Sequence, residues 1–498
     1  MAACALKISL NPNPNGVVLH RKYTYSFNTA TFCNSSNNNP PFSFITSPNH
    51  KTSHSNRFQP TPVAEPNRVS GSDSHTFDVV IVGAGIIGLT IARHFLLESN
   101  LSVAVVDAAV PCSGATGAGQ GYIWRVHKTP GSEKWELSMR SHELWEGLAE
   151  SIQNQGLDPV QALGWKKTGS MLVGRTAADC SVLKSKVEQL LDAGVDAEFL
   201  SRDGLLSEEP ALNLGEECGA AFIRDDSQLD ARRSVAFIEK ANRHFAAEGR
   251  YANFYYEPVT SLLRSESSGE IEGVQTSKYT LRSKKAVVIA AGCWSGSLMD
   301  DLIKSSEIEI DLPVKPRKGH LLVVENFKSF KLNHGLMEVG YVNHQSALDS
   351  SATSDSGTGY DANTASISMT ATMDMSGRLV LGSSRQLVGF NTEIVESIID
   401  RIWERAGEFF PTLKEVSLKD LSKSREVRVG LRPYMPGGKP VIGPVAGLSN
   451  MFIAAGHEGE GLSLALGTAE MIFNMVLGNP QEVNPAPFSL IASGLSES

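Results

Sequence analysis

The strongest structural signal in this sequence lies between residues 77 and 107. A short run of almost wholly apolar, β-branched residues at 77–82 leads directly into a Gly-Ala-Gly-Ile-Ile-Gly turn at 83–88, and a helical pattern of apolar residues follows. A second apolar run, 102–106, ends on Asp107. Apolar runs of this length are typical of strands buried on both faces of a parallel sheet. The segment therefore predicts a Rossmann-type βαβ unit that binds a dinucleotide.

Each glycine of this turn has its own expected task. Gly83 permits the tight turn, Gly85 lets the backbone approach a pyrophosphate, and Gly88 lets the helix pack closely on the strand. The helix N-terminus offers free N–H groups to the phosphates, and Asp107 accepts hydrogen bonds from ribose hydroxyls. The motif alone does not choose between FAD and NAD. The cofactor contacts expected from it are Gly83, Gly85, Ile86, Ile87, Gly88 and Asp107.

Strands of the same buried type recur far downstream, at 286–291 and 451–455. The second of them precedes a glycine-rich loop and a helical pattern at 462–477, which Gly-Asn-Pro ends. Other stretches, such as 169–173 and 377–381, look more antiparallel. We therefore expect an α/β protein whose Rossmann-type domain is assembled from discontinuous segments. An inserted α+β substrate domain is expected to be built on a mainly antiparallel sheet.

Composition excludes several classes of function. The formal net charge is −9, from 45 Lys and Arg against 54 Asp and Glu, which argues against nucleic acid or an anionic membrane surface as the main partner. No stretch approaches the ~20 uninterrupted apolar residues of a membrane-spanning helix, so no transmembrane segment is expected. The six cysteines form no CxxC pair and no Cys/His pairing at metal-ligand spacing. We expect neither a bound metal nor a disulfide framework.

The first 64 residues have a composition of their own. They contain no Asp or Glu, carry Lys and Arg at five positions, and are rich in Ser, Thr, Asn and Pro. This composition is typical of an organelle transit peptide. The low Arg content favours a chloroplast, with a mitochondrion as second choice; a plain disordered tail is the alternative. Residues 1–74 are assigned to this leader and its linker.

A second small-residue run and the sequence downstream of it indicate which dinucleotide is bound. Residues 114–121 (Gly-Ala-Thr-Gly-Ala-Gly-Gln-Gly) let backbone amides and Thr116 approach a second phosphate or a flavin ring. From here the chain resembles the D-amino-acid oxidase and glycine oxidase family of FAD-dependent oxidoreductases, over roughly residues 77–477. The resemblance rests on segments 290–295, 312–320, 377–382, 430–444 (Gly-Leu-Arg-Pro-Tyr-Met-Pro-Gly-Gly-Lys-Pro-Val-Ile-Gly-Pro) and 456–462 (Gly-His-Glu-Gly-Glu-Gly-Leu). The last of these is similar to the flavin-side loop of bacterial amino-acid and opine dehydrogenase subunits.

The resemblance implies a role for Arg432, because the arginine of the family's Gly-Leu-Arg-Pro motif binds the substrate carboxylate. A planar guanidinium can hold a carboxylate through two parallel hydrogen bonds. A structural arginine bound to loop carbonyls is the alternative. Tyr434 either reaches the substrate or only packs beside Pro433. Further cofactor contacts are expected at Thr116, Gly117, Gly119, Gln120, Gly121, Gly292, Trp294, Gly456, His457, Gly459, Glu460, Gly461 and Leu462.

Some of these polar residues also have plainer interpretations. His457 is as easily a structural histidine as a flavin ligand, and Lys318 and His320 face either the site or solvent. Solvent exposure is the plainer expectation for Glu458 and Glu460. Since no cysteine lies near the C-terminal loop in sequence, FAD is expected to bind non-covalently.

The expected function is oxidation of the C–N bond of an amino acid or related amine by hydride transfer to FAD, giving an imine that hydrolyses. Oxygen or another acceptor takes the electrons, and substrate identity and oligomeric state remain open. One alternative is a non-catalytic flavoprotein or assembly factor; another is an FAD-dependent 2-hydroxy acid dehydrogenase, since a carboxylate clamp serves both substrates. The expected FAD-binding segments are 75–160, 220–312 and 427–490; the substrate domain comprises 161–219 and 313–426, with a flexible loop at 349–366.

Overall fold

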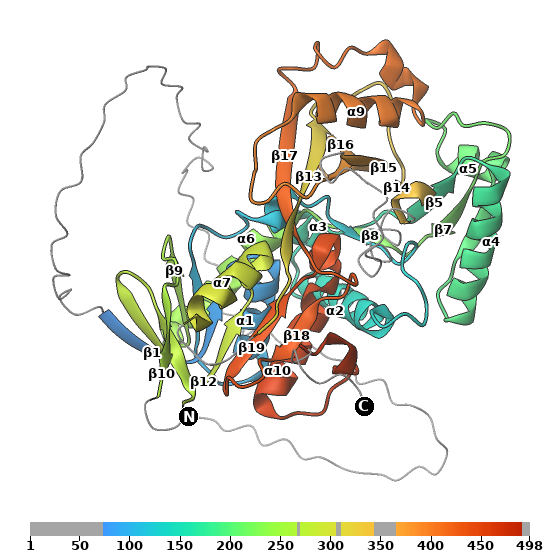
Figure 1. Ribbon diagram of the computed structural model, residues 1–498. Coiled ribbons are helices and arrows are strands. Elements are labelled where there is room, and N and C mark those ends of the chain that lie inside the picture. Colours follow the sequence, from blue (N-terminus) through green and yellow to red (C-terminus); the bar gives the residue numbers. More distant parts are fainter. Residues whose placement is uncertain (1–72, 266–268, 305–309, 343–364, 491–498) are drawn as a thin grey trace, which may run out of the picture.

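The computed structural model describes residues 73–265, 269–304, 310–342 and 365–490 (Figure 1). Residues 1–72 of the expected leader and residues 349–364 of the expected loop lie outside this part of the chain. Asp73 and Ser74, assigned to the linker, instead begin the first strand, where they pair with Tyr279 and Thr280. The proposed targeting role of the leader stays a prediction.

The first sheet has eight strands drawn from distant parts of the chain. They are β1 (Asp73–Val82), β2 (Val103–Asp107), β9 (Tyr251–Tyr255), β10 (Ser261–Arg264), β11 (Ile271–Gln275), β12 (Tyr279–Ile289), β18 (Val441–Pro444) and β19 (Met451–Ala455). Their order is β10-β11-β12-β1-β2-β9, with β19 on β12 and β18 on β19. The neighbours β1–β12, β1–β2, β2–β9 and β12–β19 are parallel.

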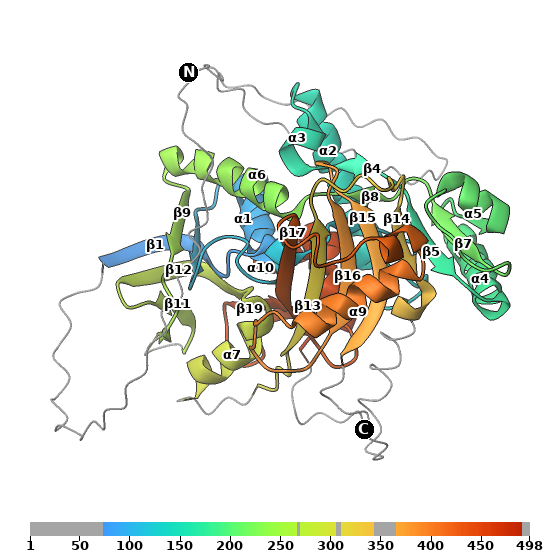
Figure 2. The same cartoon turned by 90° about the horizontal axis from the view of Figure 1, so that it is seen from above.

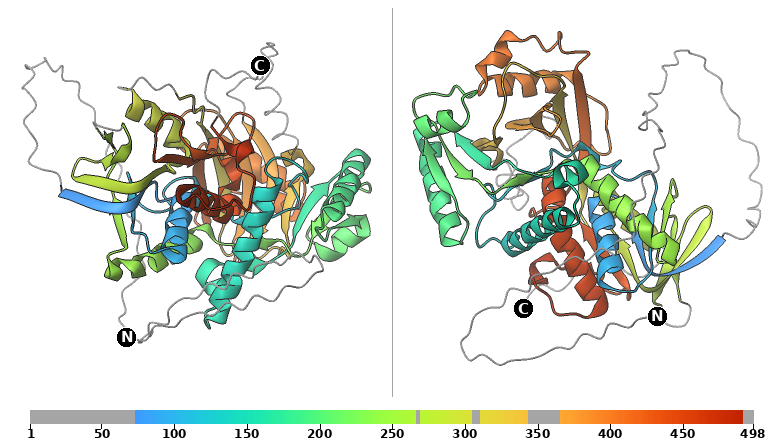
Figure 3. Two further views of the ribbon diagram at one scale, coloured as in Figure 1. Left: turned by 90° about the horizontal axis from the view of Figure 1, so that it is seen from below. Right: turned by 180° about the vertical axis from the view of Figure 1, so that it is seen from behind.

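Both faces of this sheet are covered, which explains why β1 is apolar at successive positions. Val79 and Ile81 pack toward α1 (Ile86–Glu98), α2 (Trp135–Asn154), α6 (Ala231–Arg243) and α10 (Gly461–Leu477). Val80 and Val82 point the other way, toward α7 (Ser295–Ile303). Helix α10 contacts both α1 and α2, as Figures 1 and 3 show. Gly478, at φ +68°, ends α10 as the Gly-Asn-Pro signal predicts.

The second sheet also has eight strands. They are β5 (Ser170–Gly174), β6 (Glu198–Ser201), β7 (Gly219–Ile223), β13 (Lys315–Val324), β14 (Gly335–Glu338), β15 (Ser366–Met373), β16 (Leu379–Arg385) and β17 (Arg425–Tyr434). They run in the order β17-β13-β16-β15-β14-β5-β7-β6, and of their described pairings only β14–β5 is parallel. Helix α9 (Glu396–Gly407) packs on β13, β15 and β16, while α4 (Ala177–Asp192) and α5 (Arg202–Glu208) lie at the far end (Figure 2).

A small three-stranded sheet and one short helix are among the remaining described elements. The strands are β3 (Tyr122–Ile123), β8 (Ser227–Gln228) and β4 (Lys166–Lys167), in that order, and the helix is α3 (Pro159–Leu163).

The predicted fold class is confirmed: a parallel-rich sheet from discontinuous segments accompanies a mainly antiparallel one. Two of the expected boundaries fall elsewhere. Strand β7 lies in the second sheet although 220–312 was assigned to the FAD domain, and β17 lies there although 427–490 was assigned to it. The reason is that β17 pairs with β13 along its whole length, a contact that linker composition does not reveal.

Candidate active site

One elongated cavity of about 480 Å³ lies between the two sheets. It is bounded by the carboxyl ends of β1, β2, β12 and β19 on one side and by β13, β15, β16 and β17 on the other. Asp107 and Arg432 both line it. Of the residues predicted to form the site, it is lined by Gly83, Gly85, Ile86, Ile87, Asp107, Thr116, Gly119, Gln120, Gly121, Gly292, Trp294, Arg432, His457, Gly459, Gly461 and Leu462. Five predicted residues do not line it: Gly88, Gly117, Tyr434, Gly456 and Glu460.

The glycines of the first turn serve two different needs. Gly83 has φ +118°, and a Cβ there or at Gly88 would lie closer than 3.0 Å to a backbone carbonyl oxygen. These two glycines are required by the packing of strand against helix. Gly85 differs, because a Cβ there would meet only Thr116 Oγ1, at 3.4 Å. The space in front of Gly85 therefore stays open toward the cavity.

The start of α1 and its surroundings suit a pyrophosphate. No acidic residue lies in the first turn, and Ile86 N donates to Thr116 Oγ1 at 3.3 Å. The first N–H groups of a helix have no partner within the helix and attract anions. Asp107 accepts from Ala84 N at 2.6 Å and Ala109 N at 2.7 Å, so it also fixes the turn. A carboxylate has about four acceptor positions, which leaves room for ribose hydroxyls.

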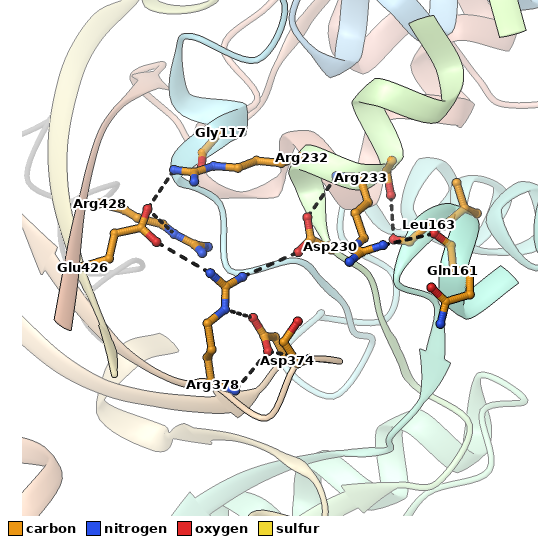
Figure 4. Close-up of polar contacts among 12 residues, drawn as sticks. Gly117, Gln161, Leu163, Asp230, Arg232, Arg233, Asp374, Arg378, Glu426 and Arg428 are labelled. Carbon is orange, nitrogen blue, oxygen red and sulfur yellow. Dashed lines mark hydrogen bonds and ion pairs between the residues drawn. The ribbon is translucent and has the colours of Figure 1, made fainter. Parts of the chain in front are cut away.

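The loop carrying Thr116 is tied to the second sheet by charged side chains (Figure 4). Arg232 donates to Gly117 O at 3.1 Å and to Glu426 Oε1, on β17, at 3.0 Å. A Cβ at Gly117 would clash with Cys112 O, so this glycine serves loop packing. The expected cofactor contact of Gly117 is therefore replaced by a structural role, because its backbone faces Arg232 and Cys112.

Arg432 lies on β17, and its guanidinium lies over Gly319 of the neighbouring strand β13, which has no side chain. Its Nη1 donates to Ser384 O at 2.9 Å. A Cβ on Gly319 of β13 would lie closer than 3.0 Å to the Arg432 guanidinium, so only glycine allows this arrangement. The side chain is half-buried and lines the cavity, with donors beyond the one bond to Ser384.

Glu458 is buried beside Arg432, where solvent exposure was expected. Its Oε1 accepts from Arg317 Nε at 2.8 Å, and its exposed fraction is 7%. Burial alone would raise the pKa of Glu458, but Arg317, Arg432 and Arg385 outweigh it and lower the pKa. Tyr434 stacks against Arg317, with 4.6 Å from the guanidinium carbon to the ring centroid. Tyr434 therefore packs outside the cavity, and its expected reach to the substrate is not supported by its position.

Glu460 is likewise buried, in an ion cluster outside the cavity. It pairs with Lys128 through Oε1 and with Lys134 through Oε2, the latter at 2.8 Å. Burial would raise the pKa of Glu460, but the two lysines and His127 lower it well below its ordinary value. Both lysines come from the loop that precedes α2. Glu460 thus fixes the start of α10 rather than extending toward the cofactor.

Replacing Glu460 with glutamine is expected to lower the free energy of unfolding by about 3–5 kcal/mol, because it removes the carboxylate that offsets the charge of the buried Lys128. The folded-state pKa is depressed, so the stabilisation is complete above the unfolded carboxyl pKa of about 4.3 and is lost as pH falls through the folded value. Unfolding monitored by circular dichroism at several pH values would measure this. Glu143→Gln, at an exposed ion pair with Arg140, is the matched control and should change little. Equal effects of the two substitutions would contradict the prediction.

The remaining polar residues singled out from the sequence are buried. His457 lines the cavity, bonds Thr468 Oγ1 at 3.0 Å, and has its pKa lowered to about 4 by burial, so it is neutral. Lys318 donates to Asn391 Oδ1 at 2.7 Å, and His320 bonds Ser384 Oγ at 2.9 Å. Neither Lys318 nor His320 is solvated, because both lie between strands of the second sheet.

Two cysteines lie in the cavity wall, although neither is close to the C-terminal loop in sequence. They are Cys112 and Cys293, and burial raises the pKa of each thiol to about 12. Protonated thiols are poor nucleophiles. Their state therefore still favours non-covalent binding of the cofactor.

Several cavity residues belong to no motif or pattern from which the sequence could have predicted them. Tyr122 and Tyr341 bring their hydroxyls to 3.1 Å of each other, and Ser383 and Thr370 also line the wall. Arg317, which pairs with Glu458 of the wall, lies in the 312–320 segment, but no role was assigned to it from the sequence. Tyr341, Thr370 and Ser383 come together only because β15, β16 and the end of β14 are adjacent.

Comparison with known proteins identifies the family. The model of the DAO family, described as FAD dependent oxidoreductase, matches residues 78–475. The chain belongs to the DAO family of FAD-dependent oxidoreductases. Its cofactor is FAD, and the open glycine turn, the α1 N-terminus and Asp107 fit the pyrophosphate and the adenosine ribose of that molecule.

Individual relatives in this family are distant but cover most of the chain. A hydrogen cyanide synthase subunit, HcnC, from Pseudomonas aeruginosa is 24% identical over 451 residues, 83% of this chain and 96% of that protein. Glycine oxidase from Bacillus licheniformis is 26% identical over 409 residues, 81% of this chain and 94% of that protein. The crystal structure of glycine oxidase from Geobacillus kaustophilus matches with a TM-score of 0.66 at 22% identity, covering 85% of this chain and 100% of the other.

The described residues contain no group of three or more His, Cys, Asp or Glu side chains that could hold a metal ion. None of the described helices is long and apolar enough to cross a membrane.

Proposed function

We propose that this protein oxidises the C–N bond of an amino acid or related amine. The observation that carries the proposal is Arg432, a guanidinium held over Gly319 in the wall of the same cavity that fits FAD. Glycine oxidases among the relatives support an amino-acid substrate. The substrate loses a hydride and a proton to become an imine, which water hydrolyses to a carbonyl compound and ammonia or an amine.

The residues of the chain bind and orient the substrate. Bound FAD supplies the hydride-accepting chemistry. Arg432 holds the carboxylate through parallel hydrogen bonds, while its bond to Ser384 O fixes the guanidinium plane. Leu321, Leu431 and Leu462 form an apolar part of the wall and exclude water. The N-terminal end of α10, at Gly461, adds a positive field to the cavity.

The testing experiment is an anaerobic absorbance titration of the FAD-loaded protein with D- and L-amino acids, glycine, N-methylated amines and 2-hydroxy acids. Bleaching of the flavin band by an amino acid or amine, with ammonia or an amine as product, is the expected result. Bleaching by 2-hydroxy acids alone would overturn the proposal in favour of a hydroxy acid dehydrogenase. A flavin that no compound bleaches would indicate a non-catalytic flavoprotein.

A further inference from the structure

The charges of three arginine side chains act on one carboxylate in the cavity wall. They are Arg317, Arg385 and Arg432, and the carboxylate is Glu458, whose pKa all three lower against the opposing effect of burial. Arg317 and Glu458 form an ion pair, with 2.8 Å from Nε to Oε1, and cancel each other's charge. Two positive charges then remain, those of Arg432 and Arg385. When one substrate carboxylate binds Arg432, the positive charge of Arg385 still has no negative charge to balance it.

Arg385, the last residue of β16, is 3% exposed and has only neutral contacts. It lies over the Tyr341 ring at 4.0 Å, and its donors lie 3.3 Å from Ser368 Oγ and 3.5 Å from Tyr341 O. No carboxylate of the described residues lies within 4.0 Å of its guanidinium. A buried charge without an opposite charge costs several kcal/mol. A negatively charged ligand would offset that cost, and Tyr341, beneath the guanidinium, lines the cavity.

Ser383, two residues earlier on the same strand, has an unused hydrogen-bonding group. This residue lines the cavity and is 3% exposed, and its buried Oγ has no partner among the described residues. A buried hydroxyl without a partner is costly and rare. Ser384, which lies between these two residues in sequence, accepts a hydrogen bond from Arg432 through its carbonyl oxygen. The end of β16 therefore combines an unpaired hydroxyl, the anchor of the carboxylate clamp and an unbalanced positive charge.

We propose that the substrate carries a second acidic group, and that the end of β16, Ser383–Arg385, recognises it. Ser383 Oγ donates a hydrogen bond to the second group. Arg385, which lies behind the Tyr341 ring, attracts its negative charge. The substrate class is an amino dicarboxylic acid or an N-carboxyalkyl amino acid. This inference rests on the proposed function, since it names the substrate class of the same site.

The first test compares acids with their neutral isosteres on the FAD-loaded enzyme. Aspartate is compared with asparagine, glutamate with glutamine in both enantiomers, and iminodiacetate with its monoamide, N-(carbamoylmethyl)glycine. The expected result is a kcat/KM roughly 10- to 100-fold higher for the acid in at least one pair, as a charge-assisted hydrogen bond would give. Equal or lower values for the acids in every pair would overturn the inference.

Substitutions on β16 test whether this strand causes the preference for acidic substrates. Arg385→Met and Ser383→Ala should each reduce the acid-to-neutral ratio of kcat/KM, Arg385→Met by about tenfold. Both should lower the value for the acid more than the value for its neutral partner, whereas a merely structural role would lower both members alike and would overturn the assignment. Arg425→Met is the control, because Arg425 pairs with Glu396 outside the cavity and should leave the ratio unchanged.

Binding to the wild-type enzyme provides a readout without turnover and without a variant that could misfold. Glutarate should bind at least tenfold more tightly than butanoate by calorimetry or by perturbation of the flavin spectrum. Neutral amino acids that reduce the flavin as well as acidic ones would leave the proposed function standing and refute the second acidic group. If only 2-hydroxy acids reduce the flavin, the proposed function fails, and malate favoured over lactate would still support the site on β16.

Discussion

Replacing Arg432 with methionine is expected to lower kcat/KM for the amino-acid substrate by about 10²- to 10⁴-fold while FAD stays bound. Each of two hydrogen bonds from a guanidinium to a carboxylate contributes about 1.5–3 kcal/mol, and every 1.4 kcal/mol is tenfold. Methionine retains much of the side-chain volume over Gly319 but has no donors. The loss should appear in anaerobic flavin reduction, with an unchanged spectrum of the oxidised flavin.

Two further variants make this result specific. Arg432→Lys keeps the charge but not the planar pair of donors, so it should recover only part of the loss. Arg428→Met, four residues earlier on β17, removes a guanidinium that pairs with Glu426 (Figure 4) and does not line the cavity. It should leave the kinetics nearly unchanged. An Arg432→Met enzyme with normal reduction kinetics would assign this arginine a purely structural role.

Replacing Gly85 with valine is expected to weaken FAD binding by about 10²- to 10³-fold without unfolding the protein. The backbone at Gly85 has φ −74°, which any residue adopts, so the substitution adds no strain. The valine methyl groups would occupy the open space in front of the helix start. There they would displace the pyrophosphate and forfeit one or two hydrogen bonds of about 1.5–3 kcal/mol each. Fluorescence titration of the apoprotein with FAD measures the effect.

The neighbouring glycines provide the contrast that separates binding from folding. Gly88→Val should destabilise the fold itself, because a Cβ there overlaps Gly83 O. Gly215→Val is the neutral control, since nothing lies within 4 Å of a Cβ at that loop position. Circular dichroism should therefore be native for the Gly85 and Gly215 variants. Native FAD affinity in Gly85→Val would contradict the placement of the pyrophosphate.

Predictions from contiguous sequence agree with the structure where the determining contacts are local. The run from β1 through the glycine turn and α1 to β2 forms as expected, because strand, turn and helix are set by neighbouring residues. Arg432 was found through the Gly-Leu-Arg-Pro segment and lies in the cavity. The boundaries at 219/220 and 426/427 fall on strands of the second sheet, since pairing of β17 with β13 joins residues more than a hundred positions apart.

The acidic residues of the 456–461 loop show most clearly the difference between features set by local sequence and features set by distant contacts. Glu458 and Glu460 look solvent-exposed in a glycine-rich loop, yet both are 7% exposed. Their partners come from sequence separations of 141 residues, for Arg317, and 332 residues, for Lys128. The sequence by itself determined the dinucleotide-binding unit, the cofactor class and the position of the arginine that we propose holds the substrate carboxylate, because these depend on short motifs. Only the tertiary structure decided which charges have an opposite charge beside them and which, like Arg385, contact neutral groups alone, because Coulomb energy depends on distance in space.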